Sequence, residues 1–141
     1  MNKILLATDG SAYSDAAARY LVQNPLLSRD FVVQLVHCEP DVAGDIKTFV
    51  DRSTLDAWHR EQNEKAMQSV ASILGEAGIA FECHGFVGFA PARIVEYAGS
   101  IGAGLIVMGS HGRGGFLEAI IGSVARRVLA HAHCPVLLVR S

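Results

Sequence analysis

The chain has 141 residues, of which 50% are hydrophobic and 18% are charged, and its formal net charge is −2. This length is typical of one domain, so residues 1–141 are expected to form a single folding unit. The apolar content excludes a disordered chain, and the absence of excess positive charge argues against a protein that binds nucleic acid. No apolar run approaches the ~20 residues that cross a bilayer, so membrane insertion is not expected.

Cysteine usage and the N-terminal segment both bear on the compartment. Cys38, Cys83 and Cys134 are an odd number of widely spaced cysteines, which does not indicate a disulfide framework. The chain begins with a strand-like apolar segment and lacks the long apolar region of a secretory signal. These features predict a protein of the reducing cytoplasm, in which Cys38 and Cys83 are small buried hydrophobic residues.

Short apolar segments alternate with segments of helical period along the whole chain. Strands are predicted over residues 3–7, 31–37, 79–86, 105–108 and 136–139. They are four to eight residues long and apolar at successive positions, as in strands of a parallel sheet that helices cover on both faces. The last of them, residues 136–139, is expected at an edge of the sheet.

The segments between the predicted strands contain four helical patterns. They are a helix capped by Ser11 and limited by Asn24-Pro25, a long one over residues 53–77 stopped by Gly78, one from Pro91 to Ile101, and one from Ser123 that ends before Cys134-Pro135. Trp58 and Met67 are predicted to pack on the inner face of the long helix. Residues 39–51 show no clear period and are predicted to be a loop, the longest in the chain.

This order of elements predicts an α/β fold, in which right-handed crossovers produce one doubly wound, five-stranded parallel sheet with helices on both faces, similar to a Rossmann fold. In such a sheet the ligand crevice lies at the carboxyl ends of the strands, near the point where the strand order reverses. The candidate ligand-binding residues are therefore those that follow the strands. They are Thr8, Asp9 and Gly10, then Cys38 and Glu39, and then Gly109 and the residues after it.

The stretch from Gly109 to Ser123 carries the most specific motif, G-x2-G-x9-G-S, formed by Gly109, Gly112, Gly122 and Ser123. Glycines let main-chain N–H groups approach an anion closely. The helix that follows Gly122 contributes unpaired N–H groups and the positive end of its dipole. Together these features predict a polyphosphate site. The spacing matches neither a P-loop nor the motif that opens a dinucleotide-binding domain, which disfavours both classes.

Several residues near the predicted crevice have two interpretations. Asp9 either contacts a ligand or binds the local backbone as a turn residue. His111 and Arg113 either donate to phosphate or form a solvated loop face. The hydroxyl of Ser123 either caps its helix or contacts a phosphate oxygen or the metal ion bound to it. The cluster of His131, His133 and Cys134 is interpreted as the basic end of a helix rather than as a zinc site, since a fourth ligand with suitable spacing is absent.

The chain resembles the universal stress protein family, and in particular its ATP-binding branch. The resemblance covers nearly all of the chain and is carried by residues 4–11, the segment from Leu35 to Cys38, residues 88–91 and the glycine motif. It implies a five-stranded α/β domain of the adenine nucleotide alpha-hydrolase-like type that forms a homodimer through its last strand, Val136 to Val139. The chain departs from the family at Ala7, a position that is often proline in ATP-binding members.

The resemblance also implies which residues hold the nucleotide. The adenine would lie near Ala7, Thr8, Asp9 and Cys38, and the phosphates along Gly109, Ser110, His111, Gly112, Arg113, Gly114 and Gly115 and at Ser123, Val124 and Ala125. Met108 and Gly122 are implied as further nucleotide-binding residues.

Three functional hypotheses follow. The first is a nucleotide-binding regulatory homodimer that takes ATP, with Mg²⁺ held through the phosphates, in a stress response and together with an unidentified protein partner. The second is a slow ATPase, or a nucleotidyl or phosphoryl transferase. No catalytic residue is assigned to it, because the sequence offers no obvious general base beyond Asp9. The third is an interaction module that works through its dimer surface without an obligatory nucleotide.

Overall fold

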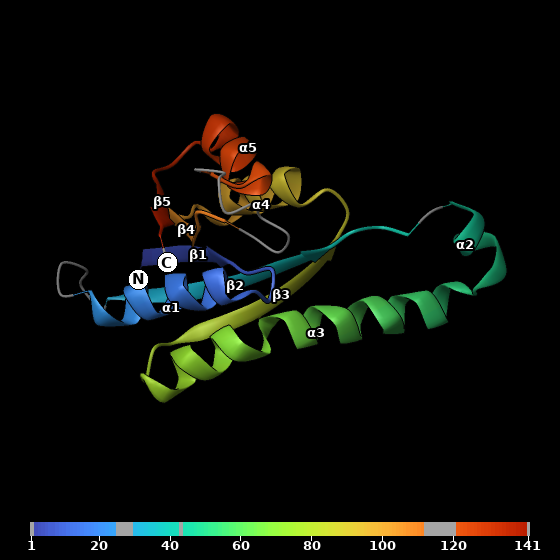
Figure 1. The fold of residues 1–141 in the computed structure, drawn as a ribbon, viewed down its shortest axis with the longest axis horizontal. Coiled ribbons are helices and arrows are strands. Elements are labelled where there is room, and N and C mark those ends of the chain that lie inside the picture. Colours follow the sequence, from blue (N-terminus) through green and yellow to red (C-terminus); the bar gives the residue numbers. More distant parts are fainter. Residues whose placement is uncertain (1, 25–29, 43, 112–120, 141) are drawn as a thin grey trace.

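One five-stranded parallel sheet forms the centre of the computed structural model, which describes residues 2–24, 30–42, 44–111 and 121–140 (Figure 1). Its strands are β1 (Asn2–Ala7), β2 (Phe31–Glu39), β3 (Phe81–Val87), β4 (Leu105–Gly109) and β5 (Val136–Val139), in the order β3-β2-β1-β4-β5. The predicted fold class and the edge position of the last strand are therefore confirmed.

The strand order reverses at β1. Ile4 of β1 is in register with Val33 of β2 on one side and with Leu105 of β4 on the other. The chain thus builds the sheet outward from β1 first toward β3 and then toward β5. The carboxyl ends of β1 and β4 consequently flank the reversal point, where open α/β sheets hold their ligands.

Helices cover both faces of the sheet. They are α1 (Ala12–Gln23), α2 (Gly44–Phe49), α3 (Arg52–Glu76), α4 (Ala90–Ile101) and α5 (Ser123–His131). α1 and α3 lie on one face and α4 and α5 on the other (Figure 1). Local chemistry sets several helix ends. Asp51 accepts a hydrogen bond of 2.7 Å from the N–H of Thr54 at the start of α3, and Gly102 ends α4 in the left-handed conformation with φ 64°.

The two faces of the sheet bury separate apolar layers, which explains the successive apolar positions in the strands. Neighbouring residues of a strand point to opposite faces. Leu6 accordingly packs in the layer under α1 and α3, and Leu5 in the layer under α4 and α5. Both side chains are fully buried. None of the helices within the described ranges is long and apolar enough to cross a membrane.

The prediction that residues 39–51 form a loop is wrong for Gly44–Phe49, which forms α2. A helix of six residues has fewer than two turns, so its sequence shows no period that could be recognised. The Lys47 ammonium lies 2.9 Å from the Asp41 carboxylate. This hydrogen-bonded ion pair lowers the pKa of Asp41.

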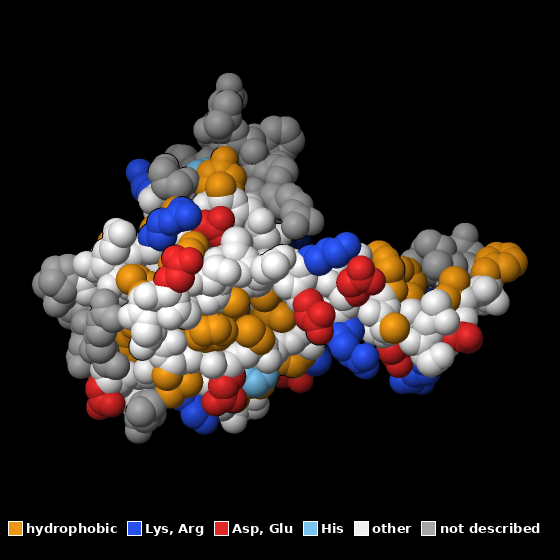
Figure 2. All heavy atoms as spheres, turned by 90° about the horizontal axis from the view of Figure 1, so that it is seen from below, with side chains coloured by type: hydrophobic (Ala, Val, Ile, Leu, Met, Phe, Trp, Pro, Cys, Tyr) orange, Lys and Arg blue, Asp and Glu red, His pale blue; other side chains and the backbone are white. Residues whose placement is uncertain are grey.

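The predictions that Trp58 packs on the inner face of its helix and that Cys83 is buried are also wrong. Trp58 is 42% exposed, because the first part of α3 extends past the sheet toward α2 (Figure 1), whereas Met67 is buried as predicted. Cys83 is exposed because β3 is an edge strand, while Cys38 is buried as predicted. Figure 2 shows the face formed by α1 and α3, with apolar side chains in its centre and others at the tip of the projecting part.

Asn63 of α3 forms a buried polar bridge to β2 and β3. Its Oδ1 lies 2.6 Å from Nδ1 of His37, and its Nδ2 donates a hydrogen bond of 3.2 Å to the carbonyl of Phe86. His37 itself is buried. Gly85 makes the bridge possible, because a Cβ at this position would lie 2.8 Å from Cβ, Cγ and Nδ2 of Asn63.

We expect Gly85→Ala to lower the free energy of unfolding by about 2 kcal/mol, because the new methyl group forces α3 away from β3. Urea unfolding followed by circular dichroism measures this loss. Gly99→Ala is the matched control, since a Cβ at this exposed helical position meets nothing within 4 Å. An equal stability of the two variants would contradict the close packing of Asn63 on Gly85.

Candidate nucleotide site

The carboxyl end of β1 leads into a turn whose side chains hold the start of α1. Oδ1 of Asp9 accepts hydrogen bonds from the N–H of Ser11, at 2.9 Å, and from the hydroxyl of Ser14, at 2.7 Å. The N–H of Asp9 donates in turn to the Ser14 oxygen at 3.1 Å. These contacts are those of a turn residue, in which the carboxylate fixes the entry to α1.

The carboxyl end of β4 packs closely against the first turn of α1. A Cβ on Gly109 would lie 2.9 Å from the carbonyl oxygen of Tyr13, so only glycine lets these segments approach this far. The next residue, Ser110, is buried, and its hydroxyl lies 3.1 Å from Nδ1 of His111. The His111 ring lies 5.5 Å from the Tyr13 ring, between centroids. The beginning of the glycine motif is thus held against α1.

The start of α5 is attached directly to the end of β4. The N–H of Gly122 donates a hydrogen bond of 2.6 Å to the carbonyl of Ser110, and the N–H of Ser110 donates to the carbonyl of Val139 at 3.0 Å. The predicted helix start at Ser123 is confirmed. Gly122, which has no side chain, is the N-cap residue of α5, so the structure does not show the capping role considered for the Ser123 hydroxyl.

The first turn of α5 contains main-chain donors that no described residue accepts from. The N–H groups of Ser123, Val124 and Ala125 have no acceptor in the part of the chain that the structure describes. The helix dipole adds positive partial charge at this end. Ala125 is buried, whereas Ser123 and Val124 are exposed. A helix start of this kind, next to the end of β4, is suited to an anion.

The end of β2 is linked to the turn that precedes α4. The N–H of Gly88 donates a hydrogen bond of 2.9 Å to the carbonyl of Glu39, and the Cys38 thiol lies 3.6 Å from the carbonyl of Gly88. Burial raises the pKa of the Cys38 thiol, and the nearby Arg93 guanidinium opposes this effect only in part. Cys38 is therefore protonated at neutral pH, which suits packing rather than nucleophilic chemistry.

The fold brings the described candidate residues to one edge of the sheet, because β1 lies between β2 and β4. The buried members are Ala7, Thr8, Cys38, Met108, Ser110 and Ala125, and the partly or fully exposed members are Asp9, Gly109, His111, Gly122, Ser123 and Val124. Gly112, Arg113, Gly114 and Gly115 lie outside the described residues.

Sequence reasoning did not identify three side chains that shape this edge. Tyr13 contacts His111, and Ser14 binds Asp9. Phe89, at the start of α4, is 59% exposed, and the Arg127 guanidinium lies 5.4 Å from its ring centroid. The spacing Asp9-x4-Ser14 at a helix start was an available signal for a capping contact, whereas the contacts across elements had no local signal.

Within the described ranges, no group of three or more His, Cys, Asp or Glu residues is placed to hold a metal ion.

Comparisons with known proteins agree on one family. A model of the universal stress protein family matches residues 1–140. The universal stress protein MJ0531 of Methanocaldococcus jannaschii is 31% identical over 144 residues, which cover 98% of this chain and 81% of that protein. The solved structure of protein MJ0577 from the same organism superposes with a TM-score of 0.80 at 27% identity, covering 99% of this chain and 96% of that chain.

A universal stress protein of Archaeoglobus fulgidus, solved in complex with dAMP, superposes with a TM-score of 0.68 over 98% of this chain and 96% of that chain. Its identity is 24%, so this likeness shows the shared fold alone.

Proposed function

Since this chain belongs to the universal stress protein family, we propose that it binds ATP at the carboxyl edge of its sheet and acts as a nucleotide-dependent regulatory protein. The observation that carries this proposal is the attachment of the α5 start to the end of β4 through Gly122 and Ser110. It holds the first N–H groups of α5, which lack an acceptor among the described residues, beside the strand-order reversal. The dAMP in the Archaeoglobus protein is the reason to test adenine nucleotides first.

In this proposal the phosphates accept hydrogen bonds from the N–H groups of Ser123, Val124 and Ala125, and residues 109–115 border them. The adenine lies toward the ends of β1 and β2, near Asp9 and Cys38. Mg²⁺ would arrive with the nucleotide, because this ion commonly keeps several waters and is held by phosphate oxygens. The ion would neutralise part of the phosphate charge.

The environment of Asp9 favours a protein that binds ATP over one that hydrolyses it. A general base must be within reach of the proton that it removes and must have a suitable pKa. Oδ1 of Asp9 already accepts two hydrogen bonds at the start of α1. We therefore propose a regulatory role, in which the occupied site biases the assembly or partner binding of a homodimer joined through β5.

Calorimetric titration of the purified protein with MgATP tests the proposal. We expect saturable binding of one nucleotide per chain with a Kd in the micromolar range, and co-purifying adenine nucleotide in mass spectra of the freshly purified protein. Titration with MgGTP under the same conditions is the control for base recognition and should give at least about tenfold weaker binding, or about 1.4 kcal/mol. Absence of saturable heat up to millimolar MgATP would reject the site.

A further inference from the structure

The outer edge of β3 presents main-chain groups that the sheet does not use. The carbonyl of Ala80 accepts from the N–H of Val33, and the N–H of Gly88 donates to the carbonyl of Glu39, so the even-numbered residues of this segment bond to β2. Main-chain groups alternate in direction along a strand. The N–H and carbonyl groups of the odd-numbered residues of Phe81–Val87 therefore point away from the sheet, where no described strand pairs with them.

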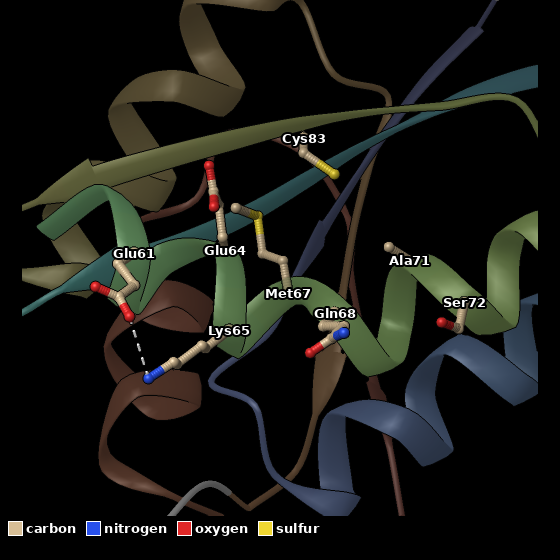
Figure 3. A pocket seen from close by; sticks show the side chains of 8 residues that line it. All are labelled: Glu61, Glu64, Lys65, Met67, Gln68, Ala71, Ser72 and Cys83. Atoms are coloured by element: carbon tan, nitrogen blue, oxygen red, sulfur yellow. Dashed lines mark ion pairs between the residues drawn. The ribbon is translucent and has the colours of Figure 1, made fainter. Parts of the chain in front are cut away.

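A groove of about 650 Å³ lies along this edge, between α3 and β3 (Figure 3). Its lining comprises Glu61, Glu64, Lys65, Met67, Gln68, Ala71 and Ser72 of α3 and Cys83 of β3. Figure 3 shows the side chains of Glu64 and Met67 rising from α3 toward β3, near Cys83. The groove thus reaches β3 at Cys83, one of the odd-numbered residues whose main-chain groups point away from the sheet.

The charge of the groove is acidic. Glu61 and Lys65 pair with each other at 3.5 Å, and both are largely exposed. The Glu64 carboxylate makes no ion pair or hydrogen bond with any residue in the described ranges. Glu82, on the other face of β3, is also exposed. A segment placed along this edge therefore meets a carboxylate on each face of the sheet.

The edge also lacks the usual protection against pairing. Natural edge strands are blunted by lysine, proline, short length or a cover. β3 has seven residues, contains neither lysine nor proline, and has one exposed acidic residue, Glu82. At a rise of about 3.3 Å per residue, this strand offers roughly 23 Å of open edge.

We propose that β3 and α3 bind an extended basic segment of a partner protein, which adds to the sheet as a strand next to β3. Its main chain pairs with the outward groups of β3, a lysine or arginine side chain pairs with Glu64, and alternate apolar side chains contact the half-buried Ala71 and the exposed Cys83. A second copy of this chain fits less well, because it would bring its own Glu64 and Glu82 to an edge that is already acidic. The proposed surface lies apart from the nucleotide site.

A capped, fluorescein-labelled probe peptide, Thr-Val-Thr-Arg-Thr-Val-Thr, tests the pairing, because its valine and arginine side chains share one face. We expect saturable binding by fluorescence anisotropy, weakened at least about tenfold by Cys83→Pro. Proline at this position removes an outward N–H but no bond to β2. Cys83→Ala is the matched control, since it keeps the N–H, and should bind the probe within about threefold of the wild type.

Glu64 provides a second variant that does not touch the strand. Glu64→Lys should abolish binding of the arginine probe and Glu64→Gln should weaken it several-fold, while both variants keep the MgATP affinity of the wild type. Probe binding that is insensitive to both Cys83→Pro and Glu64→Lys overturns the proposal, as does the absence of saturable binding. Sedimentation of Cys83→Pro is a further check, because loss of an oligomer in this variant would show that a second copy covers the edge instead.

Discussion

Gly122→Asp is expected to weaken MgATP binding at least about 100-fold, which corresponds to about 2.7 kcal/mol. The new carboxylate would lie at the N-cap of α5, where we propose the phosphates bind, and would repel them. It would also accept hydrogen bonds from the unpaired N–H groups of the first turn of α5 and so compete with the nucleotide for its donors. Calorimetry with MgATP measures the loss.

The backbone conformation of Gly122 permits the same substitution, so we expect a folded variant. Gly122 has φ −67° and ψ 161°, an extended conformation that any residue adopts, and aspartate is a favoured N-cap residue. The melting temperature of Gly122→Asp should therefore equal or exceed that of the wild type. Gly122→Asn is the matched neutral control and should lose much less affinity, because it competes for the donors without the charge. Binding by Gly122→Asp within about threefold of the wild type would contradict the proposed site.

Leu138→Pro is expected to convert the proposed homodimer into monomers. The N–H of Ile106 donates to the carbonyl of Pro135, and the N–H of Ser110 donates to that of Val139, so the odd-numbered residues of β5 bond to β4. The N–H of Leu138 then points to the open side of β5. Proline removes this donor without breaking a bond inside the sheet, and the affinity between the two chains should fall more than about 100-fold.

Sedimentation velocity at about 10 μM protein measures the change, with the wild type expected as a dimer in which each β5 pairs with the same strand of the other chain. Leu138→Ala keeps the N–H and should remain largely dimeric. A Leu138→Pro variant that still sediments as a dimer would exclude β5 as the interface. Cys83→Pro lies at the opposite edge and should leave the β5 dimer intact, so the pair of proline variants assigns any assembly to one edge or the other.

The sequence by itself determined the elements that repeat a local pattern. Successive apolar residues such as Leu5 and Leu6 predicted strands covered on both faces, and Gly78 and Gly122 marked helix ends that the structure confirms. The alternation of strands and helices was enough to predict a parallel sheet, because the handedness of crossovers leaves few other arrangements. The spacing of the glycines after β4 marked the candidate site, and this spacing is likewise a pattern among neighbouring residues of the sequence.

Only the tertiary structure decided which residues these elements bring together. Trp58 is exposed because α3 extends past the sheet, and Cys83 is exposed because no described strand pairs with the outer side of β3. The contact of Asn63 with Gly85 joins residues 22 positions apart, and that of Gly109 with Tyr13 joins residues 96 positions apart. Periodicity describes the environment of a residue only along its own segment. Burial, close approach and unpaired main-chain groups depend on which neighbours the folded chain supplies.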